Sequence, residues 1–173
     1  MDYKTKPTDR ETLRKLAYAF DKLMGTEGLI KKPVVELLDK ITDSMPFVHY
    51  EIVEDDTLPY NIPCRGGFHT DGTYLIQIKE AIYLGAIDGI GAYRNHIMHE
   101  IFHPFMLMMG FVPCLDRSFA DNTLDAYESC EWQVKAITGE YLMNYEKTKD
   151  MTVDEIILNC GVSRSAAIKR KKY

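Results

Sequence analysis

The feature that most constrains this chain is an HExxH motif at residues 99–103, formed by His99, Glu100 and His103. Histidines four positions apart lie on one face of an α-helix, about one turn from each other, so both imidazoles can reach one metal ion. The surrounding stretch, Asn95–Met109, is apolar and poor in charge, and polar groups there would be costly to bury without partners. We therefore expect a helix that carries a metal site, rather than two ordinary surface or core histidines.

The motif suits a catalytic zinc ion. Such an ion takes three protein ligands and keeps a fourth position for water, whose pKa it lowers towards ~7. Glu100 follows the first histidine directly and would lean over the open side of the ion. There it could remove the proton of that water and deliver it to a leaving amine. The same types of ligand also accept Mn²⁺, Fe²⁺ or Co²⁺.

A third ligand is expected from a second helix further along the chain. The stretch Tyr127–Met143 has apolar residues at helical spacing. Glu128 and Glu131 lie one turn apart in it. On periodicity alone either carboxylate could be the ligand, and the other would then support the site from outside or face solvent.

The length of 173 residues and an apolar fraction of 46% predict one folded domain with a single core. Thr8 and Glu11 have the spacing of a capping box, which predicts the start of a first helix that ends before Gly25. Pro33 favours the start of a second helix, which should stop before Pro46. Both helices are expected to be scaffold.

Two segments rich in β-branched and aromatic residues predict strands, at Phe47–Val53 and Thr73–Lys79. Between them, Glu54–Gly67 contains two prolines and two glycines and is expected to be a long loop. The segment Phe68–Thr70 could pair with the second strand across the turn at Asp71 and Gly72. Helices at both ends of a small sheet give an α+β fold class.

The C-terminal part is expected to form two short helices. A capping-box spacing at Thr152–Glu155 opens the first. Cys160–Ser163 forms a turn and supplies the N-cap of the second, which spans Arg164–Lys172. This arrangement is similar to a helix-turn-helix, but it is too short for a core of its own. We therefore divide the chain into a body, residues 1–146, and a helical appendage packed on it, residues 147–173.

The charge pattern limits the choice of partners. The net charge is −5, yet the last ten residues contain five basic residues and no acidic one. An acidic body disfavours a nucleic-acid binder that uses its whole surface, although the basic tail could touch DNA or an acidic partner. The N-terminus has no apolar export signal and no segment has the ~18 apolar residues of a membrane span. We expect a cytoplasmic protein that does not bind membranes.

Further landmarks accompany the motif in a fixed order: Tyr83 and Ala86, Gly89 and Gly91, Arg94, Glu131–Gln133, and Glu140–Met143. Together with HExxH this set, within residues 73–144, resembles the ImmA/IrrE-type zinc metallopeptidases of bacterial mobile elements and phages. The resemblance implies a zincin-like fold with an HExxH helix and a glutamate helix. It implies His99, His103 and Glu131 as zinc ligands, in preference to Glu128, with Glu100 as the general base.

Several residues depart from the family's pattern, among them Pro104, Lys135 and His96. Pro104 follows the second histidine and removes the amide that would bond to the carbonyl of Glu100, at a cost of ~3 kcal/mol in a regular helix. We expect a kink there. Lys135 stands where relatives carry Asn or Asp, and a lysine cannot accept the proton of His99. His96 replaces a common threonine; it shares the face of the motif and could contact substrate, support the site or act as an alternative ligand.

The resemblance implies an endopeptidase that cuts a helix-turn-helix repressor of a phage or mobile element. The segment Thr73–Lys79 is our candidate for a sheet edge that aligns an extended substrate. The departures at Pro104 and Lys135 motivate an alternative, in which a weakly active or inactive metal fold regulates through protein or DNA contacts of its basic tail. A peptidase held inactive until a partner opens its cleft is a third reading.

Overall fold

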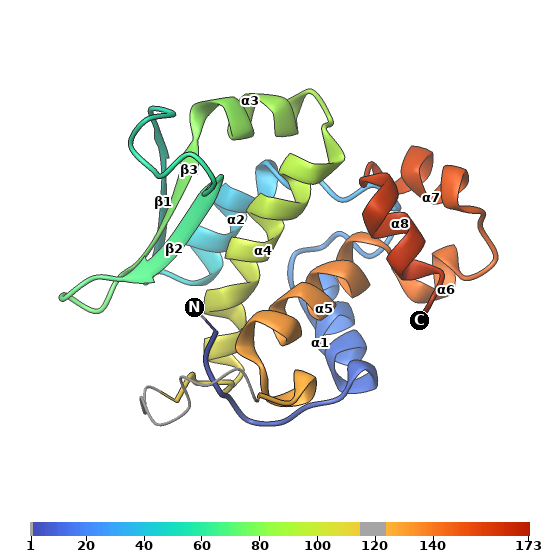
Figure 1. Cartoon of the computed structure of the whole chain (residues 1–173), viewed down its shortest axis with the longest axis horizontal. Helices are drawn as coiled ribbons and strands as arrows, with labels where there is room; N and C mark the ends of the chain where they lie inside the picture. The colour runs from blue at the N-terminus through green and yellow to red at the C-terminus, as the bar shows by residue number, and fades with distance from the viewer. Residues whose placement is uncertain (1, 115–123) are drawn as a thin grey trace.

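A computed structural model of the chain describes residues 2–114 and 124–173 and has an α+β architecture (Figure 1). In chain order its elements are α1 (Arg10–Leu23), α2 (Glu36–Ser44), β1 (Val48–Val53), β2 (Cys64–Phe68), β3 (Tyr74–Lys79), α3 (Glu80–Ile87), α4 (Gly91–Met108), the 3₁₀ turn η2 (Ala126–Glu128), α5 (Cys130–Leu142), α6 (Tyr145–Thr148), α7 (Val153–Cys160) and α8 (Arg164–Arg170). No helix among the described residues has both the length and the apolar character that crossing a membrane requires.

The two N-terminal helices form, with shifted starts. The first is capped by Asp9, whose carboxylate accepts a hydrogen bond from the Thr12 amide at 2.7 Å, so the predicted capping box at Thr8 is wrong. Asp9 is the N-cap in place of Thr8 because its carboxylate is a strong acceptor for a free amide at a helix start. Gly25 takes the left-handed conformation, with φ 64°, as expected after a helix end. The second helix begins at Glu36, three residues after Pro33.

The sheet corrects two predictions. Its strand order is β1-β3-β2, with β1 parallel and β2 antiparallel to β3. The segment predicted as the edge, β3, is therefore the central strand, and the edges are β1 and β2. The predicted loop over residues 54–67 also contains the first four residues of β2 (Cys64–Gly67), which form a strand despite two glycines because β3 supplies their backbone partners.

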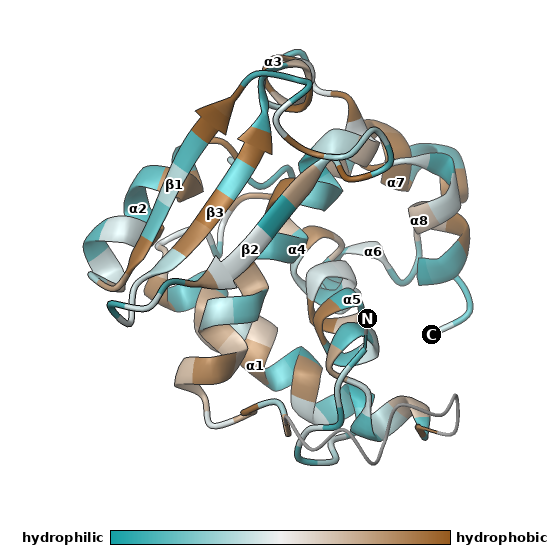
Figure 2. Cartoon of the chain, turned by 60° about the vertical axis from the view of Figure 1, so that its left-hand side comes forward, coloured by the Kyte–Doolittle hydropathy of each residue, from teal (hydrophilic) through white to brown (hydrophobic). Residues whose placement is uncertain are grey.

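Helix α4 is the centre of the molecule. It lies between the sheet on one side and α1 with α5 on the other, as Figure 1 shows. Figure 2 shows brown apolar segments on the elements that surround it. The helix is buried on most of its surface and continues through Pro104 to Met108, so the proline does not end it. The kink that Pro104 predicts in this helix beside the motif stays a prediction.

An aromatic cluster joins α4 to its neighbours. The ring of Phe102 lies 4.8 Å from that of Phe20 on α1 and 5.6 Å from that of Tyr141 on α5, measured between centroids. Phe20 also meets Phe105 edge-on at 4.9 Å. Burial of each phenylalanine contributes roughly 1.5–3 kcal/mol. Because Phe102 lies inside the HExxH motif, the same cluster that holds the core also fixes the rotation of α4 about its axis.

The C-terminal helices α7 and α8 share the core of the body. Ile156, Cys160 and Ala167 are buried in the same apolar cluster as α1, α4 and the sheet. A Cβ at Gly91 would collide with the backbone of Val162, so the turn before α8 packs directly on the first turn of α4. The predicted capping box at Thr152 is present, and the helix it starts ends at Gly161. The boundary drawn after residue 146 falls inside α6.

Candidate metal centre

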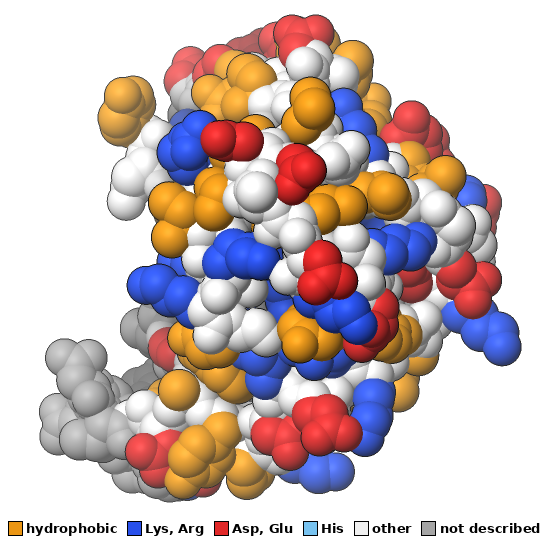
Figure 3. Space-filling model, turned by 90° about the vertical axis from the view of Figure 1, so that its right-hand side faces the viewer, with side chains coloured by type: hydrophobic (Ala, Val, Ile, Leu, Met, Phe, Trp, Pro, Cys, Tyr) orange, Lys and Arg blue, Asp and Glu red, His pale blue; other side chains and the backbone are white. Residues whose placement is uncertain are grey.

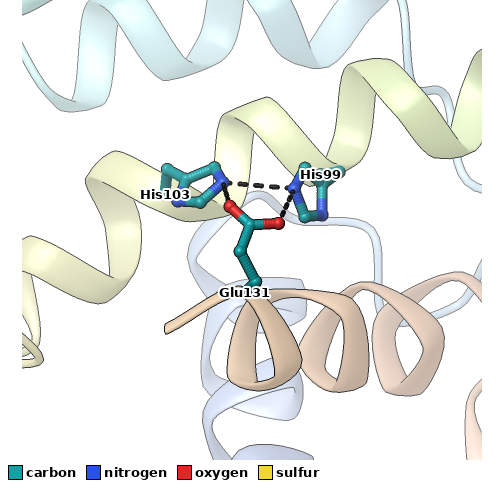
Figure 4. Close-up of side chains that lie close together, drawn as sticks. All are labelled: His99, His103 and Glu131. Carbon is teal, nitrogen blue, oxygen red and sulfur yellow. Dashed lines mark hydrogen bonds and ion pairs between the residues drawn. The ribbon is translucent and has the colours of Figure 1, made fainter. Parts of the chain in front are cut away.

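The two histidines of the motif lie on the face of α4 that looks towards α5, as Figure 4 shows. Ile101 and Phe102, between them in sequence, are fully buried on the opposite side. This division follows from helical periodicity, because residues four apart share a face. The Nε2 atoms of His99 and His103 lie 3.1 Å apart.

Glu131, in the first turn of α5, completes the cluster. Its Oε2 lies 3.4 Å from Nε2 of His99, and its Oε1 lies 3.5 Å from Nε2 of His103 (Figure 4). One carboxylate thus faces both imidazoles. The side chains come from helices that are far apart in the sequence and that pack against each other.

The N-terminus fixes the start of α5 beside Glu131. Ser129 caps the helix by accepting a hydrogen bond from the Trp132 amide at 2.9 Å. The carboxylate of Asp2 accepts a hydrogen bond from the Ser129 hydroxyl at 2.5 Å and one from the Glu131 amide at 3.1 Å. Sequence reasoning missed Asp2, because only the tertiary fold brings a residue from the start of the chain to this helix end.

The cluster has the dimensions of a metal site. Ligand atoms ~2.0–2.1 Å from a tetrahedral zinc ion are about 3.3–3.4 Å from one another. The two Nε2 atoms, 3.1 Å apart, are close to that separation, and each imidazole faces a different oxygen of Glu131, at 3.4 Å for His99 and 3.5 Å for His103. His99, His103 and Glu131 form a possible metal-binding triad, with ligand atoms that all lie within 4.8 Å of one another.

The protonation states in the cluster favour a cation. Burial, reinforced by neighbouring His99, lowers the pKa of His103 to about 4. That imidazole is therefore neutral at pH 7 and keeps a lone pair. A hydrogen bond with His99 outweighs partial burial and lowers the pKa of Glu131 to about 2. A neutral imidazole and an ionised carboxylate are the forms that bind metal ions.

Glu100 is held apart from the triad, next to strand β2. Burial raises the pKa of Glu100, while His99 and the backbone amide of Gly66 partly oppose that rise. A carboxylate whose pKa lies above its ordinary value accepts and releases a proton more readily near neutral pH. The arrangement fits a group that exchanges protons rather than one that binds the ion.

Gly66 leaves room for the ring of Tyr74 on the neighbouring strand β3. A Cβ at this position would overlap the ring of Tyr74, which is buried against it. Sequence reasoning missed Gly66 because it assigned the residue to a loop. A glycine inside a strand often marks close approach of another group, and that signal was present in the Gly66 and Gly67 pair.

Other predicted site residues lie outside the triad. Glu128 belongs to η2, and its carboxylate pairs with Lys4 at 3.1 Å. His96 is exposed one turn before His99. Lys135 contacts Glu131, with Nζ 3.6 Å from Oε2, and its side chain is 67% exposed. Lys135 therefore touches the carboxylate of the triad rather than a histidine.

Comparison with known proteins gives a fold neighbour but no family. No family model matches the chain, and no curated protein matches it in sequence. A solved structure of a Mycobacterium tuberculosis transcriptional regulator is similar, with a TM-score of 0.52 and 14% sequence identity. The match covers 94% of this chain and 52% of that one, so this chain spans about half the length of its neighbour. At this identity the likeness concerns the fold alone.

Proposed function

We propose that this protein is a zinc-dependent endopeptidase with a zincin-like arrangement of helices. The observation that carries the proposal is the convergence of His99, His103 and Glu131, whose ligand atoms all lie within 4.8 Å of one another. Two nitrogen ligands and one carboxylate are the set that zinc peptidases use, with one position left for water or substrate. The ligand set also accepts Mn²⁺ and other divalent ions, and zinc is preferred for its tetrahedral geometry.

The residues of the chain would divide the work of hydrolysis. A bound zinc ion supplies a Lewis acid and lowers the pKa of water. Glu100 would take the proton from the attacking water and pass it to the leaving amine, a role that its raised pKa supports. Phe102 and Ile101 would hold the helix in register behind the site.

The substrate would be an extended segment of another protein. Strand β2 is an edge of the sheet and contacts α4 near Glu100, which makes it the candidate for main-chain pairing with a peptide. This edge replaces β3, which has partners on both sides. The choice of a helix-turn-helix repressor as substrate rests on the resemblance to the ImmA/IrrE-type peptidases.

The first experiment measures metal content and cleavage together. Protein purified without added metal should carry one zinc ion per chain and cut a repressor encoded beside its own gene. Glu100→Gln should keep the zinc and reduce cleavage by roughly 10²–10⁴-fold. Glu128→Gln, the same change near Glu131 but outside the triad, should keep both properties. Undiminished cleavage by Glu100→Gln, or a protein that binds no divalent ion, would contradict the proposal.

A second candidate function is regulation by a metal fold without efficient catalysis. The contact between Lys135 and Glu131 favours it, because a cation beside the carboxylate competes with a metal ion for the same charge. This candidate predicts that metal binds but that neither a repressor nor a generic peptide mixture is cut. A partner or DNA would then bind through the basic C-terminal segment.

A further inference from the structure

A second candidate site lies beside the metal centre, in a cavity of about 580 Å³ between α4, α5 and α8. His96 and Lys135 belong to its wall, one turn along α4 and α5 from the metal triad. Five lysines and arginines line it beside His96: Arg10, Lys135, Lys169, Arg170 and Lys172. None of the described residues that line it is acidic, although the whole chain has a net charge of −5.

Two arginines of the cavity lining, Arg10 and Arg170, share one buried carboxylate with a third arginine that lies outside the lining. Glu140 is fully buried, and its carboxylate pairs with three guanidinium groups: Arg10 at 3.3 Å, Arg14 at 2.9 Å and Arg170 at 2.9 Å. One carboxylate neutralises only one of the three. The remaining charge lies at the wall that Arg10 and Arg170 form, where a bound anion would balance it.

Arg170 carries a second, independent sign of a missing partner. Its side chain is 3% exposed, and its Nη2 is buried without a hydrogen-bond partner among the described residues. An unpaired buried donor costs about 1–3 kcal/mol, and more when it is charged. A guanidinium that has one arm on Glu140 and the other free can receive an oxyanion with that free arm.

The shape and lining favour a small phosphorylated ligand. A volume of about 580 Å³ falls within the ~300–1,000 Å³ of small-molecule sites. The guanidinium carbon of Arg10 lies 3.8 Å from the ring centroid of Tyr173, and such stacking orients its planar fork for phosphate. Trp132 adds an aromatic wall.

The surrounding surface disfavours a duplex of nucleic acid as the ligand. Figure 3 shows the side of the molecule that carries α6, α7 and α8, where basic side chains are interspersed with acidic and apolar ones. Arg164, outside the cavity, is paired with Asp154 at 2.6 Å. Positive charge is therefore concentrated in a pocket rather than along a stripe that could follow a phosphate backbone.

We propose that this cavity binds a small ligand with two or more phosphate groups, in contact with Arg170, Lys169 and Lys172. This inference is independent of the proposed peptidase activity. Inorganic oligophosphate and a nucleoside triphosphate share the recognised chemistry. Their relative affinities would show whether Trp132 and its neighbours also recognise a base.

The test is calorimetric titration of the full chain with inorganic tripolyphosphate, and separately with ATP. Titrations are run with zinc and on metal-free protein, because a phosphate that only ligates the metal would lose its binding when the metal is removed. Tripolyphosphate should bind in both states, and more weakly as salt is added. If ATP binds several-fold tighter, the natural ligand is a nucleotide; equal affinity indicates an oligophosphate. Either result supports the proposal.

Charge variants distinguish the cavity from general attraction. Lys169→Gln with Lys172→Gln removes two charges from the lining and should weaken binding about tenfold or more. Lys22→Gln with Lys171→Gln removes two charges outside the lining and should change affinity by less than about twofold. Both lysine pairs are exposed, so the fold should survive. Equal losses in the two variants, no binding in the metal-free state, or duplex DNA that binds more tightly through the same lysines would overturn the proposal.

Discussion

Helix α5 carries a glutamate at each end, and the two meet different partners. Glu131, in its first turn, faces two imidazoles, and its side chain is 32% exposed. Glu140, in its last turn, has no exposed surface and meets three guanidinium groups. Both residues sit among apolar neighbours on the same helix, so their helical position alone does not explain the difference.

The difference shows how the partners of a buried carboxylate decide its role. Permanently charged arginines neutralise Glu140 and tie α5 to α1 and α8, which makes it a structural residue. The neutral imidazole of His103 does not neutralise Glu131 in the same way, so that carboxylate retains the capacity to bind a cation. The exposed side of Glu131 also gives an ion a path to the site. Variants of the two glutamates should therefore have opposite effects on stability and metal binding.

The largest effect is expected from Glu140→Gln. Removing the charge leaves three arginines without their buried partner, which should lower the free energy of unfolding by about 3–5 kcal/mol. Zinc affinity of the folded protein should change little, since the triad is untouched. Denaturant unfolding and a metal titration of the same variant would measure the two quantities. A stable variant would show that this network is not structural.

Glu131→Gln should reduce zinc affinity strongly and the stability of the metal-free protein only slightly. An amide oxygen is a poorer ligand than a carboxylate, so zinc affinity should fall by about 100-fold or more. The metal-free variant should lose less stability than Glu140→Gln, because Glu131 is partly exposed and its ion pair with Lys135 is screened by solvent. Zinc titration with a competing chelator gives the first value. Unchanged affinity would remove Glu131 from the ligand set.

Acid should reduce the contribution of Glu140 to stability. Burial alone would raise the pKa of Glu140, but Arg14 and Arg170 outweigh it and lower that pKa below the ordinary value of 4.5. A lowered pKa in the folded state stabilises the fold above the pKa of the unfolded chain, and this stabilisation is lost as pH falls through the lowered value. The stability gap between wild type and Glu140→Gln should therefore be full at pH 6–7 and shrink below pH ~4.5. A gap that is constant from pH 7 to pH 3 would contradict this origin.

The smallest effect is expected from Lys135→Ala. Its Nζ lies 3.6 Å from Glu131, and its side chain is mostly exposed, so the pair is worth roughly 0.2–1 kcal/mol. Removing this competing cation should raise zinc affinity by about two- to five-fold, more at low salt than at high salt. Lys147→Ala, on α6, should leave zinc affinity unchanged. Weaker zinc binding by Lys135→Ala would mean that the lysine supports the site.

Local sequence patterns predicted most of the helices, but few of the contacts that these helices make with distant segments. The caps at Thr152 and Ser163 and the end at Gly161 satisfy backbone groups within a few residues, so they can be read directly from the sequence. The HExxH spacing likewise predicted two histidines on one face. The choice of Asp9 over Thr8 was missed, because adjacent residues competed for the same free amide.

Pairings between distant segments required the tertiary structure. Spacing left Glu128 and Glu131 equivalent; the fold brings Glu131 to the histidines and Glu128 to Lys4. Strand β3 lies in the middle of the sheet because β2 pairs with it. The two glycines of β2 had led to the prediction of a loop there. The surplus of arginines around Glu140 arises from α1, α5 and α8 together, and no local pattern predicts it.

The sequence by itself determined the regions that form helices, the caps at Thr152 and Ser163, and that two imidazoles share a helix face, because those features depend on hydrogen bonds and periodicity within a few residues. Only the tertiary structure decided which carboxylate faces the imidazoles, which strand is free and where unbalanced positive charge collects. These depend on packing between segments far apart in the chain, whose free energy comes from burying surfaces that no short stretch of sequence contains.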